Sequence, residues 1–518
     1  MGKKITRRRF LAAAGATYLA LTNLVGCELL GQASGVSPVR TPEVGAVRIP
    51  RRVLPLPGAS SALEEGAWAF RSRPDLTPPV AEVATKAHDT APGYIFVAPQ
   101  TGGAGQGGSL IVDDRGEVVW FRPLPAVFGR AMDLKVQSYK GNPVLTWMET
   151  PGEVASEYVI ADSTYREIAR IRAANGYDGD HHEFHISPQD TALITIYSPV
   201  PVDLTPFGGL QNGLAWQGII QELDIETGEV LFEWRSLEHV GLDETHAGLM
   251  QDGRPGFDYF HINSIDVDHD NNLLVSARET FTVYKIDRLS GEIIWRLGGK
   301  KSDFEMQKGS RFAFQHDARR LSDGKISIFD NGTTVFHDDL PEAIEESRAI
   351  VLEVDEDKMQ AKLVGEYTHP DKMFADAAGN TQVLPNGNVF VGWGRALAVS
   401  EFDHDGKMLF DLTLPAENRS YRAFRFPWNA QPDGAPAADA ERTSREEAKV
   451  FASWNGATEV ASWEVLAGPG PDRLESLGSV PRDGFETAML ARTSNAYLAV
   501  KARDQSGREL GITRLIEL

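Results

Sequence analysis

The sequence predicts an all-β protein in which a six-bladed β-propeller precedes a β-sandwich of immunoglobulin or fibronectin type. Beyond about residue 91, short runs rich in β-branched and aromatic residues alternate with turns rich in Gly, Asp and Asn. Two different hairpin phrases recur along this region, which makes four strands in each repeat. A Pro- and Ala-rich segment then separates the repeats from six short alternating runs at the C-terminal end.

The first 27 residues predict an export signal instead of folded structure. Thr6 to Leu11 reads TRRRFL, as in twin-arginine signals, and the apolar stretch that follows is too short and too mixed to span a membrane permanently. Leu24 to Cys27 then resembles a bacterial lipobox, in which the cysteine is lipidated and becomes the new N-terminus. Cys27 is the only cysteine, so disulfides cannot stabilise the folded part. The alternative is a plain cleaved signal with an incidental thiol.

The charge balance argues against a nucleic-acid partner. The chain has 52 Lys and Arg against 73 Asp and Glu, which gives a net charge of −21. Cleavage before Cys27 would remove five basic residues and no acid, so −21 − 5 gives −26 for the mature chain. This charge repels nucleic acid and anionic lipid headgroups at long range. We therefore expect twin-arginine export and membrane attachment only through a lipid on Cys27, at the outer face of the cell membrane or in the periplasm.

Residues 28–90 predict a tether followed by a covering segment, because they are rich in Pro, Ala, Ser and Gly. The helical candidate in this part is SALEEGAWAFRSR, residues 61–73.

The blades are inferred from a phrase that combines a strand, an acidic turn, Gly and an apolar strand. Its four clear copies are separated by 112, 63 and 115 residues and centre on Gly116, Gly228, Gly291 and Gly406. Because the two long intervals are each close to twice the short one, one degenerate copy is expected in each of them. ADSTYREIARI near Tyr165 and VDEDKMQAKLV near Lys358 fill these places, so the phrase occurs six times.

A second phrase, strand, tight polar turn, strand, precedes the later copies by some 30 to 45 residues. Its examples are MDLKVQSYKGNPVLTW, HHEFHISPQDTALITI, HINSIDVDHDNNLLVS, QHDARRLSDGKISIF and NTQVLPNGNVFVGW. Radial repeats of four strands are typical of β-propellers, and we place six blades at residues 91–425. A linker is expected at 426–445 and the sandwich at 446–518.

Histidine opens the second phrase in three successive repeats, where the inner strands of a propeller begin near one mouth of the central channel. These histidines are His182, with His181 and His185 beside it, His261 and His316. The hairpin that begins at His261 also returns Arg278 to the same end. Imidazoles together with a guanidinium suit an anion with several oxygens, which suggests phosphate or sulfate chemistry.

The runs HHEFHISPQDTALITI, YFHINSIDVDHDNNLLVSAR and FQHDARRLSDGKISIFDNG resemble the arylsulfotransferase family of PAPS-independent bacterial enzymes, especially the branch with a C-terminal sandwich. The resemblance covers most of the chain from about residue 90 onward. It implies a six-bladed propeller that moves a sulfuryl group from a phenolic ester to another phenol through a sulfohistidine, with no cofactor. The implied partners are a small aryl sulfate donor and a phenolic acceptor.

The resemblance also implies roles for individual residues. His316 in QHDA matches the family's nucleophilic histidine, which would attack sulfur as a neutral imidazole. His261 in HINS and Arg278 in SAR match its sulfate-binding and charge-stabilising positions, and His182 in HEF is the best match for its remaining histidine. Further candidates for substrate binding are His181, His185, Asn263, Arg319 and Trp393. Trp393 could instead pack inside a blade.

Other interpretations of these motifs stay open. HHEFH could hold a metal, since His181 and His185 would share one face of a strand, but it is not the helical HExxH of zincins and we predict no metal. Residues 266–272 lack the Gly and closing Glu of a calcium loop, and the GxGxxG at residues 103–108 precedes a strand. The chain could also be a non-catalytic, lipid-anchored propeller that binds a ligand or a partner protein, or a sulfatase-like hydrolase.

Overall fold

The computed structural model describes residues 52–57, 61–62, 66–100, 102–124, 129–151, 155–249, 256–335 and 344–518. The predicted export signal, Cys27 and the first part of the predicted tether lie outside these ranges. The helical elements in the described part are short: α1 (Ser236–His239) and the 3-10 turns η1 (Thr205–Phe207), η2 (Leu242–Glu244) and η3 (Gly394–Ala396). None of them is long and apolar enough to cross a membrane.

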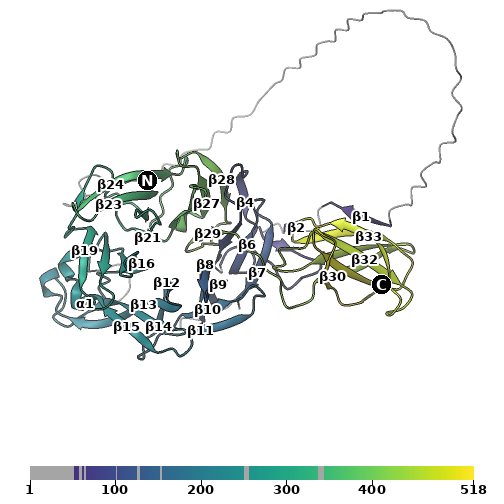
Figure 1. Ribbon diagram of the computed structural model, residues 1–518, viewed down its shortest axis with the longest axis horizontal. Helices are drawn as coiled ribbons and strands as arrows, with labels where there is room; N and C mark the ends of the chain where they lie inside the picture. Colours follow the sequence, from purple (N-terminus) through teal and green to yellow (C-terminus); the bar gives the residue numbers. More distant parts are fainter. Residues whose placement is uncertain are drawn as a thin grey trace, which may run out of the picture. The chain divides into compact units, whose positions relative to one another are not determined.

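Six sheets of four or five strands follow one another along the described chain and surround a common centre (Figure 1). From the inner strand outward, the first two sheets are β29 (Ala423–Phe426), β5 (Tyr94–Val97), β6 (Gly108–Val112), β7 (Val118–Pro123), and β8 (Gly129–Tyr139), β9 (Asn142–Pro151), β10 (Glu157–Ala161), β11 (Glu167–Ile171). The next two are β12 (Gly179–Ile186), β13 (Thr191–Val202), β14 (Gly213–Asp224), β15 (Val230–Arg235), and β16 (Ile262–Val267), β17 (Leu273–Ala277), β18 (Thr282–Ile286), β19 (Ile293–Gly298). The last two are β21 (His316–Arg320), β22 (Ile326–Asp330), β23 (Arg348–Asp355), β24 (Gln360–Thr368), β20 (Glu305–Met306), and β25 (Asn380–Val383), β26 (Val389–Gly392), β27 (Ala398–Phe402), β28 (Met408–Thr413), β4 (Glu82–Thr85).

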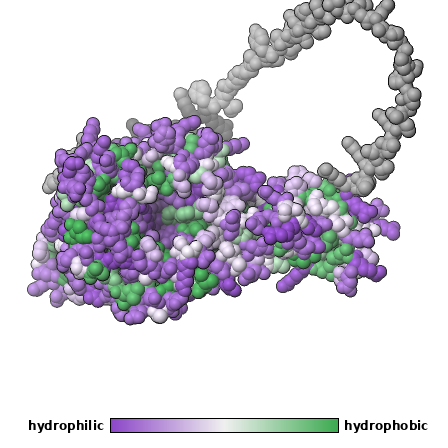
Figure 2. Space-filling view, viewed as in Figure 1, coloured by the Kyte–Doolittle hydropathy of each residue, from purple (hydrophilic) through white to green (hydrophobic). Residues whose placement is uncertain are grey.

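The six sheets close into a ring. Each inner strand contacts the next, in the order β29, β8, β12, β16, β21, β25 and back to β29. Separate hydrophobic cores fill the spaces between consecutive sheets. Leu110 of the first sheet and Phe410 of the sixth share one of these cores, which closes the ring. The predicted all-β propeller is thereby confirmed, and mostly hydrophilic residues cover its visible face in Figure 2.

The strand that completes the first sheet comes from the far end of the propeller sequence. In β29, Phe424 pairs with Phe96 of β5, so the innermost strand of the first sheet is contributed by the last repeat. At the outer edge of the sixth sheet, β4 pairs with β28 through Val83 and Leu412. Chain segments from both ends of the propeller therefore hold the ring together, although residues 82–85 were predicted as part of a covering segment.

Both hairpin phrases form the hairpins that the sequence predicted. The acidic-turn phrase joins the third and fourth strands of every sheet, and the second phrase joins the first and second strands of the second to sixth sheets. Gly116 (φ 75°) and Gly406 (φ 81°) adopt the left-handed conformation that these turns require. In the degenerate copies Tyr165 (φ 63°) and Met359 (φ 49°) adopt it, so Met359 and not Lys358 is the equivalent residue.

The predicted sandwich is also present. Its two sheets are β1 (Val53–Leu56), β34 (Glu486–Arg492), β31 (Glu447–Ser453), β30 (Ala437–Ser444), and β33 (Glu475–Pro481), β32 (Ser462–Gly468), β35 (Tyr497–Arg503), β36 (Glu509–Ile512), with β37 (Ile516–Glu517) paired to β35. They enclose a hydrophobic core of their own, which includes Trp463 and Met489.

The edges of the sandwich differ from the sequence prediction. Strand β30 begins at Ala437, inside the expected linker, and β1 lies inside the expected tether, where Val53 pairs with Ala491. The predicted helix at 61–73 is wrong, because β2 (Ser61–Ala62) and β3 (Trp68–Ala69) form an antiparallel pair there. Pairing over such long sequence separations leaves no local pattern that would reveal it.

Irregularities in the inner strands decide which side chains face the channel. Four inner strands shift register, between Met132 and Lys135, Gly179 and Phe184, Ile262 and Ser264, and His316 and Arg319. Three non-glycine residues at or beside these shifts have left-handed backbone: Asp133 (φ 58°), His261 (φ 53°) and Asp317 (φ 56°). Bulges of this kind re-aim side chains, and strained backbone concentrates at functional sites.

Candidate active site

A cavity of about 350 Å³ lies at the mouth of the channel where the inner strands begin. The predicted residues His181, His182, His261, Arg278 and His316 all line it. They come from the third, fourth and fifth sheets, which are separated by long stretches of sequence. Ring closure therefore brings together the five side chains that the histidine pattern selected.

His316, the first residue of β21, is held by two acceptors on one ring nitrogen. Its Nδ1 lies 2.7 Å from Asn331 Oδ1 and 3.1 Å from the Phe314 carbonyl oxygen. The Asn331 side-chain nitrogen donates to the carbonyl oxygens of Ala375 (2.8 Å) and Ala378 (3.0 Å), which turns Oδ1 toward the imidazole. Nδ1 therefore carries the proton, and the Nε2 lone pair accepts a long hydrogen bond from the Ala378 N–H at 3.2 Å.

The charge state of His316 follows from its surroundings. The side chain is buried, and this burial lowers the pKa of His316 well below its usual value of about 6.5. The positive charge of Arg278 lowers this pKa further. His316 is therefore a neutral imidazole near pH 7, with its lone pair on Nε2.

The other two central histidines are each oriented by a carboxylate. His182 Nδ1 lies 2.5 Å from Asp180 Oδ2, and His261 Nδ1 lies 2.6 Å from Asp258 Oδ2. Burial alone would raise the pKa of each carboxyl group, but the adjacent imidazoles outweigh it and lower the pKa of both Asp180 and Asp258. Both carboxylates are thus ionised and can stabilise a positive charge on the ring that each one holds.

The rings of the site are close to one another. The centroids of His182 and His261 are 4.9 Å apart, and those of His181 and His182 are 4.5 Å apart. Tyr421 lies between two sheets, with its ring 5.6 Å from His182 and 6.2 Å from His316. One small substituent can therefore contact several imidazoles at once.

Arg278 approaches the site from the end of the second strand of the fourth sheet. Its backbone N–H donates to the His261 carbonyl oxygen at 2.9 Å, as the predicted hairpin requires. The guanidinium pairs with Glu279, donates to the Asp376 carbonyl oxygen at 2.9 Å and lies 4.5 Å from the centroid of the Phe314 ring. Its Nε is buried and has no hydrogen-bond partner among the described residues.

The HINS and QHDA motifs hold each other in place. The Asn263 side chain donates to the Gln315 carbonyl oxygen at 2.7 Å, and the Ala318 N–H donates to Ser264 Oγ at 3.1 Å. The Gln315 side chain returns to the fourth sheet, where it donates to Ser276 Oγ and to the Ala277 carbonyl oxygen. Asn263 thus positions the backbone beside His316 and does not line the cavity, contrary to its predicted role in substrate binding.

The sequence model of the arylsulfotransferase (ASST) family matches residues 135–417, more than half of the chain. The chain belongs to the arylsulfotransferase family. The match spans the sheets that carry His182, His261, Arg278 and His316. The chain is therefore an arylsulfotransferase-like enzyme.

Other comparisons are more distant. A search of the curated proteins returned no match. Among solved structures, a protein of unknown function from Bacteroides caccae is 15% identical, with coverage of 64% of this chain and 98% of that one and a TM-score of 0.39. A protein from Lactobacillus plantarum is 14% identical (82% and 99%, TM-score 0.35), and a catalytically inactive virginiamycin B lyase from Staphylococcus aureus with quinupristin is 9% identical (79% and 99%, TM-score 0.33). These weak similarities carry no argument about the activity of this arylsulfotransferase.

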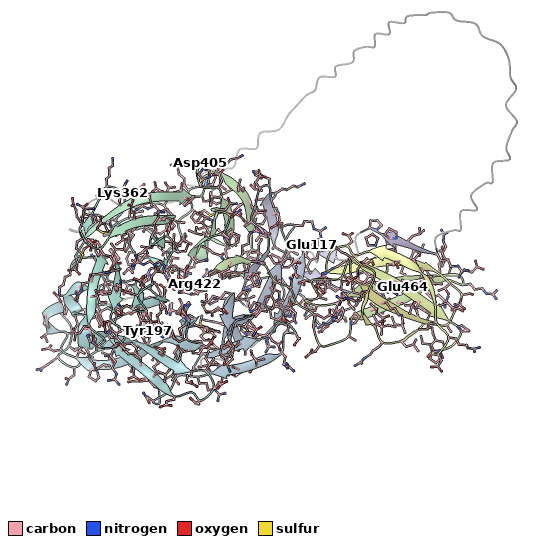
Figure 3. The ribbon with its side chains drawn as sticks, in the orientation of Figure 1. Glu117, Tyr197, Lys362, Asp405, Arg422 and Glu464 are labelled. Carbon is pink, nitrogen blue, oxygen red and sulfur yellow. The ribbon has the colours of Figure 1, made fainter. Side chains whose placement is uncertain are left out.

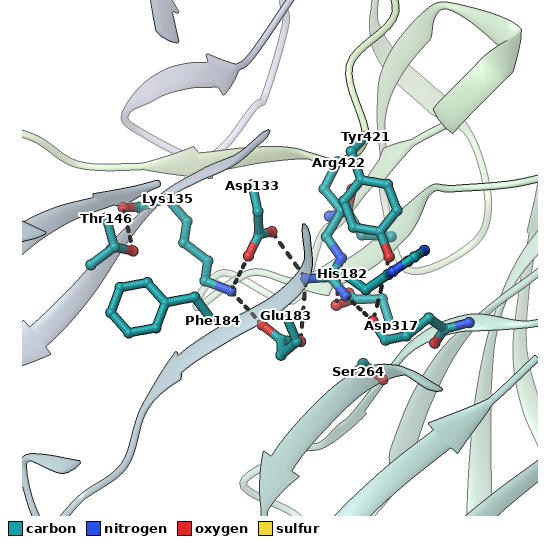
Figure 4. Close-up of polar contacts among 12 residues, drawn as sticks. Asp133, Lys135, Thr146, His182, Glu183, Phe184, Ser264, Asp317, Tyr421 and Arg422 are labelled. Carbon is teal, nitrogen blue, oxygen red and sulfur yellow. Dashed lines mark hydrogen bonds and ion pairs between the residues drawn. The ribbon is translucent and has the colours of Figure 1, made fainter. Parts of the chain in front are cut away.

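Below the site, a cluster of buried charges crosses the channel (Figure 4). Its members are three carboxylates and three cations: Asp133, Glu183, Asp317, Lys135, Arg319 and Arg422. Arg422 is fully buried near the centre of the ring (Figure 3), with its guanidinium 3.0 Å from Asp133, 3.2 Å from Glu183 and 3.3 Å from Asp317. Each charge has at least one partner of opposite sign, so the cluster forms a charge-compensated floor below the site.

Two predicted substrate-binding residues face a second cavity on the other side of this floor, and one of them, Arg319, is also part of the floor. His185 and Arg319 line this cavity of about 800 Å³ together with Lys135, Asp266 and Phe426. The register shift in β12 explains the placement of His185, because it puts His182 at the site and Glu183 in the floor. His185 then reaches the opposite mouth.

Trp393 and the metal hypothesis are also corrected. Trp393 is fully buried within the sixth sheet and donates its indole N–H to Ser400 Oγ at 2.9 Å, so it packs a blade. A metal held by His181 and His185 together is wrong, because the two rings line different cavities. Ligand atoms of Asp180, His181 and His182 do lie within 4.8 Å of one another, and the hydrogen bond between Asp180 and His182 accounts for this.

Sequence reasoning missed the residues that support the histidines. Asp180 and Asp258 precede their histidine partners by two and three residues, so short Asp-to-His spacings were the available signal. Asn331 follows the strand that pairs with His316, and its role could be found only by placing that hairpin in register. Tyr421 belongs to the segment that closes the ring, for which the sequence gives no comparable signal.

Proposed function

We propose that this enzyme transfers a sulfuryl group from a phenolic sulfate ester to a phenolic acceptor through a sulfohistidine at His316. The observation that carries the proposal is the fixed tautomer of His316, a neutral imidazole whose Nε2 lone pair lies in a cavity with Arg278, His182 and His261. Family membership supports aryl sulfotransfer in general. The sulfohistidine and the assignment of steps below are our inference.

In the first half-reaction the Nε2 lone pair of His316 attacks sulfur, an N–S bond forms, and the ester S–O bond breaks to release a phenolate. This requires the substrate to displace the long hydrogen bond from the Ala378 N–H. The Arg278 guanidinium stabilises the charge on the sulfuryl oxygens. An imidazolium at His182 or His261, held by its carboxylate, protonates the departing phenolate.

In the second half-reaction an acceptor phenol takes the place of the departed phenol. The histidine that gave up its proton accepts the phenolic proton, the phenol oxygen attacks sulfur, and the N–S bond breaks. His316 returns to the neutral state with its lone pair on Nε2. Protons and charge balance over the cycle, and neither a nucleotide nor a metal is required by these steps.

The test uses 4-nitrophenyl sulfate as donor and phenol as acceptor. Release of nitrophenol should depend on the acceptor, and His316→Ala should abolish it. His404→Ala is the matched control, because His404 is exposed and pairs only with Asp405. Mass spectrometry after incubation with donor alone should find a sulfuryl group on His316.

The alternatives give different results in the same assay. Nitrophenol release that is independent of a phenol would indicate a hydrolase that uses water. Absence of turnover across varied donors, together with no sulfated histidine, would refute the proposal and favour a non-catalytic propeller that binds a ligand or a partner protein. Turnover that survives His316→Ala would exclude His316 as the nucleophile.

We further propose that the enzyme works outside the cytoplasm, attached to the membrane through a lipid on Cys27. The proposal is supported by the twin-arginine and lipobox patterns in residues 1–27. A single cysteine at the end of an apolar stretch is otherwise unusual in an exported chain.

A further inference from the structure

We infer that the substrate carries a second anionic group, a carboxylate or similar acid, which binds to cavity-lining arginines that the proposed sulfuryl transfer does not use. The inference rests on the proposed function and extends it to the class of phenol that is bound. Different sheets contribute the histidines and these arginines to the cavity wall. The histidines and Arg278 come from the third to fifth sheets, whereas Arg130, Arg395 and Arg419 come from the second sheet, the sixth sheet and the closing segment.

We call Arg130, Arg395 and Arg419 the arginine arc. These residues make few ion pairs or hydrogen bonds. Arg130 has no ion pair or side-chain hydrogen bond among the described residues. Arg419 approaches Glu417 only at 4.0 Å, with both side chains exposed. Arg395 pairs with Asp376 at 3.1 Å and adds to the positive field of the arc. Arg130 and Arg419 are therefore available for a ligand.

The acids of the cavity wall do not neutralise these two arginines. Asp258 is hydrogen-bonded to His261, Glu279 pairs with Arg278, and Asp376 pairs with Arg395. Within the described part of the chain, Arg130 and Arg419 therefore line the cavity with no ion pair closer than the 4.0 Å contact between Arg419 and Glu417.

The histidines with Arg278 on one hand, and the arginine arc on the other, together determine the orientation of a bound ligand. Tyr421 lies 6.2 Å from His316, centroid to centroid, and lines the same cavity as the arginines, so we place the aryl group beside Tyr421 and its far end at the arginines. Guanidinium groups bind carboxylates through paired hydrogen bonds, which fixes orientation as well as charge. Because donor and acceptor phenols occupy the same place in the two half-reactions, the arc serves both.

The experiment compares an acceptor pair that differs only in charge, 3-(4-hydroxyphenyl)propanoate and its methyl ester, with 4-nitrophenyl sulfate as donor. We expect wild type to favour the acid over the ester in kcat/KM by about tenfold, as for a charge-assisted contact. The preference should appear in KM, because a distant group contributes uniform binding, and it should weaken as salt is raised. The sulfate esters of the same two phenols, used as donors, test the donor side.

The double variant Arg130→Gln, Arg419→Gln should reduce the preference for the acid to about the level of the ester. Arg514→Gln, an exposed arginine of the sandwich, is the matched control and should leave the preference unchanged. Equal kcat/KM values for acid and ester in wild type would overturn the inference while leaving sulfuryl transfer intact. An unchanged preference in the double variant would also overturn it.

Calorimetry separates this inference from the proposed function. Titration of wild type and the double variant with 3-(4-hydroxyphenyl)propanoate and its ester measures binding without catalysis. Selective binding of the acid that disappears in the double variant supports the arginine subsite even if no donor is turned over. Failure of the acid to bind better than the ester refutes the subsite whatever the enzyme's activity.

Discussion

Replacement of Asn331 by alanine tests whether the tautomer of His316 sets the rate. Asn331 is completely buried and joins three groups through hydrogen bonds: the His316 Nδ1–H (2.7 Å) and the carbonyl oxygens of Ala375 (2.8 Å) and Ala378 (3.0 Å). Without this acceptor, only the Phe314 carbonyl oxygen at 3.1 Å holds the proton on Nδ1, so a larger share of the imidazole carries its proton on Nε2, where it would block attack on sulfur.

The expected magnitudes follow from the contacts that remain. The Phe314 carbonyl oxygen still lies 3.1 Å from His316 Nδ1, and Ser347 Oγ still reaches the Ala375 carbonyl oxygen at 3.4 Å. Only the Ala378 carbonyl oxygen loses its side-chain donor. We therefore expect a loss of about 3 kcal/mol in the free energy of unfolding, as for a buried polar group left unsatisfied. Loss of a residue that orients an active histidine should lower kcat about 10- to 100-fold.

The assay is acceptor-dependent release of nitrophenol, with urea denaturation of the same samples. Asn380→Ala is the matched control: Asn380 is equally buried and makes two hydrogen bonds to the Ala423 backbone (2.7 and 2.9 Å), but does not contact His316. Asn331→Asp keeps an acceptor for the Nδ1–H and should retain more activity than Asn331→Ala. If Asn380→Ala lowers kcat as much as Asn331→Ala at similar stability, the tautomer argument fails.

Three further outcomes are expected. Arg422→Met should lower the free energy of unfolding by about 3–5 kcal/mol, because it leaves three buried carboxylates with only two buried cations, Lys135 and Arg319; a change below about 1 kcal/mol in urea denaturation would contradict this. Burial lowers the pKa of His181 to about 4, of His185 to about 3 and of His316 well below its usual value, so the folded state binds fewer protons than the unfolded state below pH 6.5. Stability should therefore fall as the pH falls from about 6.5 toward 4, and a thermal midpoint that is equal at pH 7 and pH 5 would refute the assignment. Cys27→Ser should move the protein from the membrane fraction to the soluble fraction, whereas retention in the membrane fraction would exclude a lipid anchor at this position.

Much of the propeller was predictable because its signals are local. A turn that needs left-handed backbone favours Gly, and four such turns, with the two degenerate copies that their spacing requires, count the hairpins before any long-range pairing is known. The site histidines were predictable for a related reason, since His261 and His316 stand at equivalent places in successive repeats. Residues at equivalent positions of successive repeats lie at the same mouth of the central channel once the ring is closed.

The errors have physical causes that a single sequence does not reveal. Strict alternation along β12 would put His181 and His185 on one face, but the register shift moves His185 to the far cavity. Arg319 follows the bulge at Asp317 and joins the floor instead of the site. Strand β1 was missed because its partner lies more than 400 residues away.

The position of β29 has a consequence for biosynthesis. Tyr421 and Arg422 immediately precede this strand, so the residues that complete the pocket and its floor are among the last of the propeller to leave the ribosome. A nascent chain shorter than about 420 residues has neither a closed circle nor a finished pocket. The pocket is therefore completed only late in synthesis, and we expect truncated translation products that end before β29 to be inactive.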